Sequence, residues 1–166
     1  MLVSGRARSW AWRAAAALVC ALAAMVALSG CAGLSSMKIA VASAYIPQPT
    51  TPGTTVAYLD IRNNATQPDQ LEAVSTSVGG KVGFLAPDGM SSSGTMIMKL
   101  VQDISVAPDS LLRMNPNSYR LRITGAGPMQ GGKDVILTLK FAHAGMVNVV
   151  ALVTNPASGG SSYFLN

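Results

Sequence analysis

Methionine is the residue type in this sequence whose chemistry and spacing suggest a binding site. Met96 and Met98 are two residues apart, so on a strand they share a face, and Met90 precedes them across a serine-rich turn. Thioether sulfur is a soft ligand that suits Cu(I). Methionine also fills irregular gaps in cores that have few large aromatic residues. The sequence leaves both interpretations open, with Met129 and His143 as further copper(I) ligand candidates.

The other reactive side chains do not indicate an enzyme. His143 is the one histidine of the sequence, and it falls in a predicted hairpin turn, where side chains are usually solvated. A single histidine does not build a histidine-based zinc site. The acidic residues are dispersed, without a close pair for acid–base catalysis, and no glycine-rich loop opens a helix to bind phosphate. We therefore predict no catalytic residue.

Residues 1–30 have the pattern of a signal peptide. Several arginines precede an uncharged apolar run at residues 14–27, which is shorter than the roughly 20 residues that span a bilayer. Small residues then lead to Cys31 in Leu-Ser-Gly-Cys at positions 28–31, a tetrapeptide that resembles the bacterial lipobox. The resemblance implies transfer of lipid to the Cys31 thiol and cleavage of the chain before it.

Lipidation of Cys31 predicts a lipoprotein held by its lipid anchor on the extracytoplasmic face of a cell membrane, because several acyl chains on one residue bind a bilayer almost permanently. Cys20 leaves with the signal peptide, so the mature chain has no thiol for a disulfide or a thiolate metal site. Loss of the N-terminal arginines lowers the formal net charge from +5 to +2. No basic run remains, so nucleic acid is not a predicted partner.

After a lipidated tether at residues 31–37, residues 38–154 have the pattern of strands. In residues 54–62, Ala57, Leu59 and Ile61 alternate with more polar side chains, as on a strand with one buried face. Turn residues separate the runs. The predicted strands are residues 38–45, 54–62, 70–77, 81–85, 95–99, 104–106, 118–124, 134–142 and 146–153. We predict one all-β domain, a β-sandwich of about eight or nine strands, with residues 155–166 as a tail or an added edge strand.

This domain resembles the PCuAC family of periplasmic and cell-surface copper chaperones. The segments that carry the resemblance are residues 44–47, 53–64, 69–71, 74–76, 137–141 and 144–147. The resemblance implies a cupredoxin-like, Greek-key β-sandwich that carries Cu(I) to respiratory oxidase assembly. It also implies an envelope protein as a partner.

The copper motif of that family is only partly present. The family pattern is a histidine, then a methionine, then a His-x-Met pair, and by resemblance these positions fall near Leu85 and at Met98, Arg120 and Arg122. Arginine has no lone pair to offer a metal. Two arginines at about 4 Å would also repel Cu(I) by roughly 4 kcal/mol each.

Three functions stay open from the sequence. In the first, a non-enzymatic binding module has lost the usual His/Met copper site and binds a carboxylate, a phosphate or an acidic partner through Arg120 and Arg122. In the second, a copper(I) chaperone uses a methionine-rich site at Met90, Met96 and Met98. In a variant of the first function, the arginines only solvate an outer strand face. In the third, the protein is a purely structural envelope lipoprotein.

Overall fold

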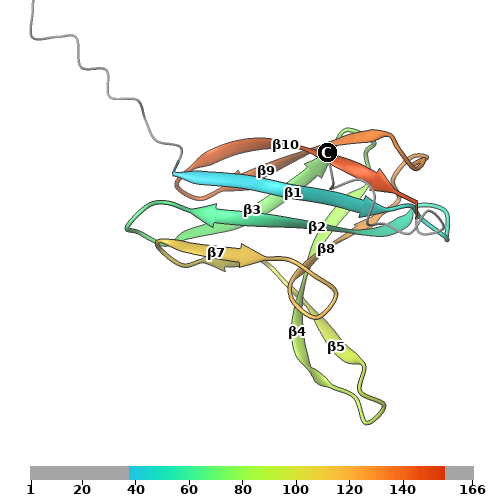
Figure 1. The fold of residues 1–166 in the computed structure, drawn as a ribbon, viewed down its shortest axis with the longest axis horizontal. Helices are drawn as coiled ribbons and strands as arrows, with labels where there is room; N and C mark the ends of the chain where they lie inside the picture. The colour runs from blue at the N-terminus through green and yellow to red at the C-terminus, as the bar shows by residue number, and fades with distance from the viewer. Residues whose placement is uncertain (1–37, 156–166) are drawn as a thin grey trace, which may run out of the picture. The chain divides into compact units, whose positions relative to one another are not determined.

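The computed structural model describes residues 38–155, which form ten strands and no helix (Figure 1). The predicted signal peptide, Cys31, the tether and residues 156–166 of the tail lie outside the described residues. The strands are β1 (Ile39–Pro47), β2 (Thr54–Asn63), β3 (Asp69–Thr76), β4 (Lys81–Met90), β5 (Met96–Val101), β6 (Ile104–Val106), β7 (Ser110–Arg113), β8 (Arg120–Thr124), β9 (Asp134–Phe141) and β10 (Gly145–Thr154). The predicted all-β fold is confirmed.

Strand β2 connects the two halves of the fold. The hydrogen-bonded order is β5-β4-β8-β2-β1-β10-β9-β3-β6, and β7 also pairs with β2. Residues 54–57 of β2 pair with β8, whereas residues 60–63 pair with β7. Neighbouring strands are antiparallel except β1 and β10, which pair in parallel from Tyr45 and Leu152 onward. The chain thereby forms one curved, mixed sheet that folds over its own core.

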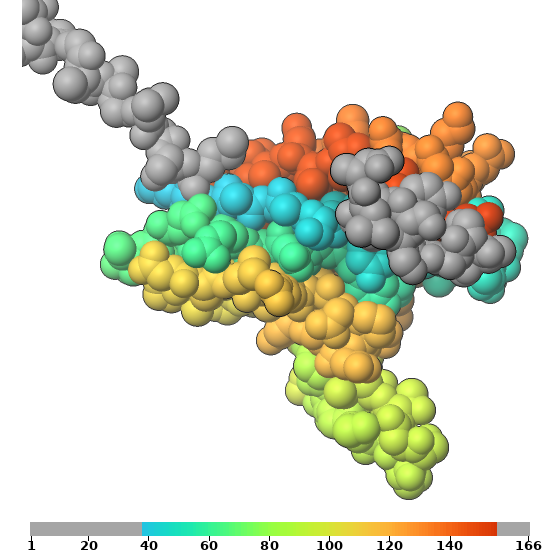
Figure 2. All heavy atoms as spheres, viewed as in Figure 1, coloured from blue at the N-terminus to red at the C-terminus, as the bar shows by residue number. Residues whose placement is uncertain are grey.

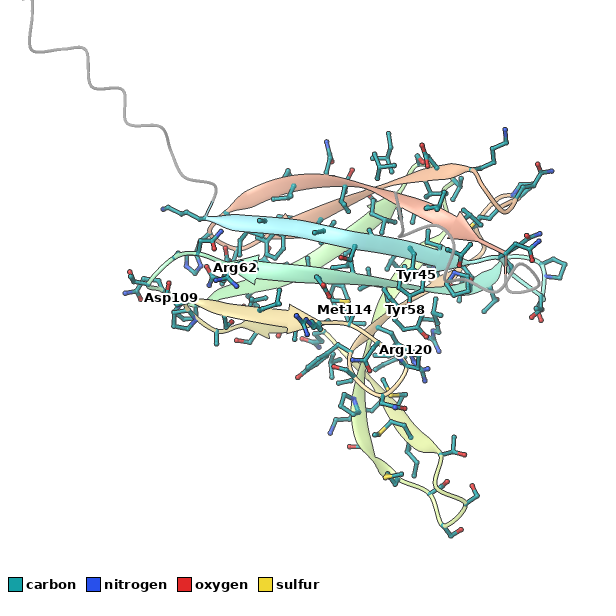
Figure 3. The ribbon with its side chains drawn as sticks, in the orientation of Figure 1. Tyr45, Tyr58, Arg62, Asp109, Met114 and Arg120 are labelled. Atoms are coloured by element: carbon teal, nitrogen blue, oxygen red, sulfur yellow. The ribbon has the colours of Figure 1, made fainter. Side chains whose placement is uncertain are left out.

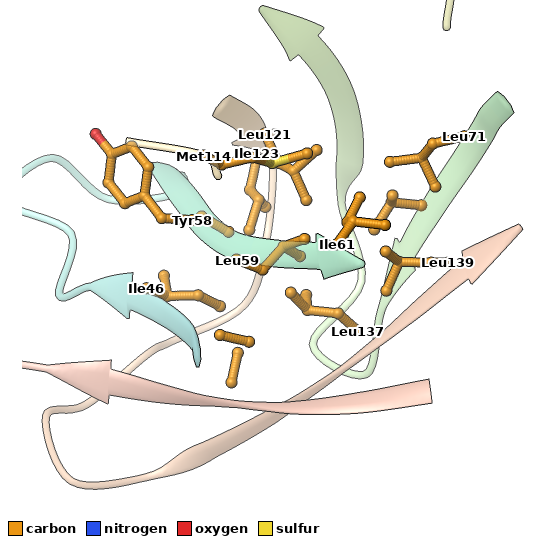
Figure 4. Close-up of a cluster of buried hydrophobic side chains, with 14 of the residues drawn as sticks. Ile46, Tyr58, Leu59, Ile61, Leu71, Met114, Leu121, Ile123, Leu137 and Leu139 are labelled. Carbon is orange, nitrogen blue, oxygen red and sulfur yellow. The ribbon is translucent and has the colours of Figure 1, made fainter. Parts of the chain in front are cut away.

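The core consists of the apolar faces that the alternation predicts. Ala57, Leu59 and Ile61 are at most 1% exposed, and Leu137 and Leu139 of β9 are fully buried opposite them (Figure 4). Burying each large aliphatic side chain contributes about 1.5–3 kcal/mol. This packing holds β2 and β9 against each other, and β8 adds its own apolar face to the same cluster.

Tyr58 is buried although it belongs to the more polar face of β2. Only 5% of it is exposed. Tyr45 of β1 lies beside it, with ring centroids 5.1 Å apart and ring planes inclined by 33°, an arrangement within the range of favourable aromatic pairs. The aromatic pair therefore covers the outer side of β2 next to the core.

Two strands differ from the prediction by more than two residues. β7 was not predicted, because four residues between Asp109 and Met114 are too few for the alternation to stand out. β4 continues beyond Leu85 to Met90, through a Pro-Asp-Gly sequence that is typical of a turn. Pro87 is tolerated because the pairing of β4 with β8 ends at Leu85, so the missing N–H faces no third strand.

Asp69 ties the start of β3 to the turn between β9 and β10. Its carboxylate is 6% exposed and accepts backbone N–H groups from Gln70 (2.8 Å), His143 (2.9 Å) and Ala144 (2.9 Å). Burial raises the pKa of Asp69, but these donors, together with the His143 side chain, bring the net pKa below its usual value. The imidazole itself is 74% exposed, which confirms the predicted turn position of His143.

We expect Asp69→Asn to lower the free energy of unfolding by about 1–3 kcal/mol, because an amide nitrogen would face backbone donors in a buried place. A pKa that is depressed in the folded state adds stability above the aspartate pKa of the unfolded chain, and this stability is lost as the pH falls through the folded-state pKa. The difference between the two proteins should therefore shrink in acid. Urea unfolding at several pH values measures it. The exposed Asp103→Asn is the control, and equal losses in both variants would contradict this role.

Candidate functional site

The hairpin of β4 and β5 projects from the rest of the domain (Figures 1 and 2). Its outer part pairs Pro87 with Met98, Gly89 with Ile97 and Met90 with Met96, with a β-bulge between Pro87 and Gly89. Within the described residues, β5 pairs with β4 alone, and β4 has lost β8 as a neighbour at this point. The end of the hairpin is therefore a two-stranded ribbon, a form with little stability of its own in water.

Met90, Met96 and Met98 lie on one face of this ribbon. Met90 and Met96 are directly opposite each other, which places their Cβ atoms about 4.5–5.5 Å apart. Met98 is two residues further along β5 and points to the same side. Met90 is 67% exposed, and the other two are half-buried. Sulfur atoms can be followed along the projecting hairpin in Figure 3.

The other sulfur and nitrogen candidates lie elsewhere. Met129 is 7% exposed and belongs to the hydrophobic core, as does Met114. His143 lies in the turn between β9 and β10, with its Nδ1 3.3 Å from a carboxylate oxygen of Asp69. The described methionines therefore divide into the core residues Met114 and Met129, the exposed Met146 of β10 and the set on the hairpin. From here on, Met90, Met96 and Met98 are called the methionine face.

Arg120 and Arg122 share the outer face of β8. Leu121 between them is fully buried, so the two arginines must point away from the core. Leu85 of β4 lies opposite Arg120 and also opposite Leu100 of β5, which places all three in one row across the strands. The positions that the family resemblance marks for copper, at Leu85, Met98 and both arginines, are thus on one side of the sheet. Leucine and arginine cannot ligate a metal there.

Arg120 is more enclosed than a typical surface arginine. Its Nε is buried and has no hydrogen-bond partner among residues 38–155. The neighbouring Leu85 is 9% exposed although it lies on the outer side of the sheet, as expected where an aliphatic arginine stem covers an apolar residue. An unpaired guanidinium N–H in such a place is an unsatisfied donor.

The methionine face extends away from the arginines. β5 is two strands away from β8, which carries Arg120. Along β5, Met98 is two residues and Met96 four residues beyond Leu100, the residue in the row of Arg120. With about 3.3 Å per residue and 4.8 Å per strand, the Cα atom of Arg120 is roughly 12 Å from that of Met98 and roughly 16 Å from that of Met96. Backbone separations of this size, compared with a Debye length of about 8 Å in physiological salt, weaken the repulsion relative to a metal held about 4 Å from the arginines.

The described residues offer few other sites. No group of three or more His, Cys, Asp or Glu side chains within residues 38–155 could hold a metal ion. The same residues include no helix that is long and apolar enough to cross a membrane. A cavity of about 350 Å³ is lined by Pro49, Thr50, Pro52, Gly53, Ala126, Gly127, Pro128 and Met129. It has no ionisable side chain, so it offers no acid or base for catalysis.

Solved structures confirm the fold. The structure titled "Copper-bound PCuAC domain from PmoF2" is similar with a TM-score of 0.59 and 22% sequence identity, over 72% of this chain and 94% of that chain. The apo PCuAC domain from PmoF1 has a TM-score of 0.60 and 21% identity, over 72% and 95%. The solution structure of apo-DR1885 from Deinococcus radiodurans has a TM-score of 0.53 and 23% identity, over 73% and 81%. These likenesses show a PCuAC, cupredoxin-like fold.

The comparison with curated proteins gave no match. A family model with the description "Putative lipoprotein LpqE-like" matches residues 39–153. This range runs from the first residue of β1 almost to the end of β10 and includes the methionine face and both arginines. The chain therefore belongs to the LpqE-like family.

Proposed function

We propose that this protein is a membrane-anchored, non-enzymatic lipoprotein that carries Cu(I) on the methionine face, in place of the histidine and methionine site that the PCuAC resemblance implies. The observation that carries the proposal is the common face of Met90, Met96 and Met98 at the end of a projecting hairpin. Two proteins with a similar fold are described as copper-bound or Cu(I)-bound by their titles. The fold and the sulfur ligands thus support the same metal.

The chemistry of the methionine face fits a soft, singly charged cargo. Thioethers are neutral and polarisable, so they favour Cu(I) over the hard cations that prefer oxygen ligands. The side chains are long and flexible, which allows sulfurs on neighbouring positions of one face to converge on one ion. Because Met90 is exposed, a metal held there is accessible to an acceptor. A site of this kind suits transfer of copper rather than permanent storage.

Removal of sulfur from the methionine face should weaken Cu(I) binding. We expect the double variant Met96→Leu, Met98→Leu to lose at least about tenfold in Cu(I) affinity for each thioether, equivalent to about 1.4 kcal/mol each. Leucine keeps a similar volume, so the fold should persist. Competition titration against a Cu(I) chelator under reducing conditions measures the affinity.

Met146→Leu is the matched control for this experiment. Met146 is 65% exposed, nearly as much as Met90, but it lies on β10 in another part of the sheet. Its replacement should leave Cu(I) affinity unchanged. Equal affinity of the unsubstituted protein and the double variant, or no measurable Cu(I) binding, would rule out the methionine face as a copper site.

Anchoring at Cys31 is the second part of the proposal. It is supported by the lipobox-like tetrapeptide at residues 28–31 and by the description of the family as lipoproteins. We expect Cys31→Ala to move the protein from the membrane fraction to the soluble extracytoplasmic fraction, since no acyl chains could then be attached. Fractionation and phase separation in detergent measure this shift. Membrane association that persists in the variant would contradict the lipid anchor.

A second function, binding of an anionic group on an envelope protein partner, is favoured by the outward face of β8, where Arg120 is half-buried and Arg122 is exposed. Arg122 lies two residues away on the same face, so together they could bind a carboxylate-bearing segment. We expect a hexaglutamate peptide to shift NMR signals of β8, with binding that weakens as salt increases. Arg120→Gln with Arg122→Gln should abolish the shifts, whereas the exposed Lys133→Gln should not. Shifts that survive the double substitution would contradict this function.

A further inference from the structure

Strand β5 leaves one edge of the sheet unpaired. It is the first strand in the hydrogen-bonded order, and β4 is its one neighbour among the described strands. Its side chains include Ile97 and Leu100, which are 48% and 56% exposed. It has no proline, and the β-bulge of the hairpin falls in the facing segment of β4 between Pro87 and Gly89. Edges of this kind readily add another strand.

The one charge on β5 gives little protection against such pairing. Lysine on an edge strand typically prevents pairing with another strand, and β5 carries Lys99. Its Nζ is 2.7 Å from a carboxylate oxygen of Asp88 on the adjacent strand. This ion pair is largely exposed to solvent and carries no net charge. The edge therefore presents apolar side chains and unpaired backbone groups beside one lysine whose charge is partly offset by Asp88.

We propose that β5 pairs in antiparallel fashion with β5 of a second copy of this chain, so that the two projecting hairpins form one continuous sheet across a two-fold axis. A two-fold axis normal to the sheet requires residues of the same face to lie opposite each other. Met98 of one copy then lies opposite Met98 of the other. Ile97 lies opposite Lys99, and Met96 lies opposite Leu100.

This register is the one that the charges and the strand length favour. It brings most of β5 into contact, and no like charges are opposite each other. Moving the axis one residue toward Val101 would place Lys99 of one copy directly against Lys99 of the other, which is unfavourable. Moving it one residue the other way would leave only Met96 to Met98 of each strand paired. Met96, Met98 and Leu100 instead meet one another, and each lysine meets an isoleucine. The strand is thus complementary to itself, which selects a second copy over an unrelated strand as the occupant.

Pairing of two copies would also place their methionine faces side by side, with the two Met98 side chains at the axis. A contact through a single short strand buries less than the roughly 1,200 Å² of a stable interface, so we expect a weak dimer that a shared membrane surface would favour by raising the effective concentration. The inference goes beyond the proposed copper function and does not depend on it. Metal-free protein tests it.

Cysteine cross-linking of the full chain in isolated membranes tests the register. The variants are Met98→Cys at the axis, Met90→Cys on the same face but on β4, and Met146→Cys on β10, each oxidised with diamide in the presence of a copper chelator. We expect disulfide-linked dimers for Met98→Cys at least tenfold in excess over the other two, with the unsubstituted chain as background. Equal cross-linking at the three positions, or none at Met98→Cys, would overturn the proposal.

A pair of charge variants that share one cysteine background gives a second test of the register. In the Met98→Cys background, Ile97→Lys would place a cation opposite Lys99 of the other copy, whereas Ile97→Glu would place an anion there. We expect the dimer band to fall severalfold with Ile97→Lys and to persist with Ile97→Glu. Equal bands in the two variants would contradict β5 pairing in this register. The dimer band is measured without copper, so it does not depend on the outcome of the Cu(I) titration. The two proposals can therefore fail separately.

Discussion

The two-residue alternation of the strands is the constraint on which both the core and the functional surface depend. Burial of Leu121 and Ile123 inside the domain forces Arg120 and Arg122 outward. The same rule places Met96 and Met98 together on β5. A slip of one residue in either strand would exchange the buried and exposed side chains completely. The hydrophobic core therefore fixes which chemistry reaches the surface, and this surface holds arginine and methionine but no histidine.

Register across β8, β4 and β5 then sets how these groups act on each other. Arg120, Leu85 and Leu100 occupy one row, while the methionine face begins beyond that row and continues along the hairpin. Cationic and soft groups share a side of the sheet, with the Cα atoms of Arg120 and of Met98 and Met96 roughly 12 and 16 Å apart. The positive charge of the arginines on β8 and the neutral sulfurs at the end of the hairpin can coexist. An anion and a copper(I) ion would therefore bind to different parts of the same face of the sheet.

The projecting hairpin combines low intrinsic stability with high accessibility. Turn hydrogen bonds among Ser91, Ser93 and Thr95, together with the Lys99–Asp88 ion pair, hold a ribbon that has no third strand at its end. Surface contacts of this kind contribute little stability each. Local opening is consequently less costly here than in the strands around Leu59 and Leu139. Ligand exchange and strand pairing both benefit from such a segment.

The sequence by itself determined the all-β class, the buried residues of β2 and β9, and the exposed turn at His143. It also determined that Arg120 and Arg122 place positive charge on one face of a strand. Each of these follows from side-chain alternation or turn chemistry. It did not determine β7, the extension of β4 through Pro87, or the separation of Met129 from Met98. These depend on which strands become neighbours and where pairing with β8 stops, properties that involve residues far apart in the chain. Only the tertiary structure decides them, since a proline or a methionine has the same local pattern at an edge, in a core or on a free hairpin.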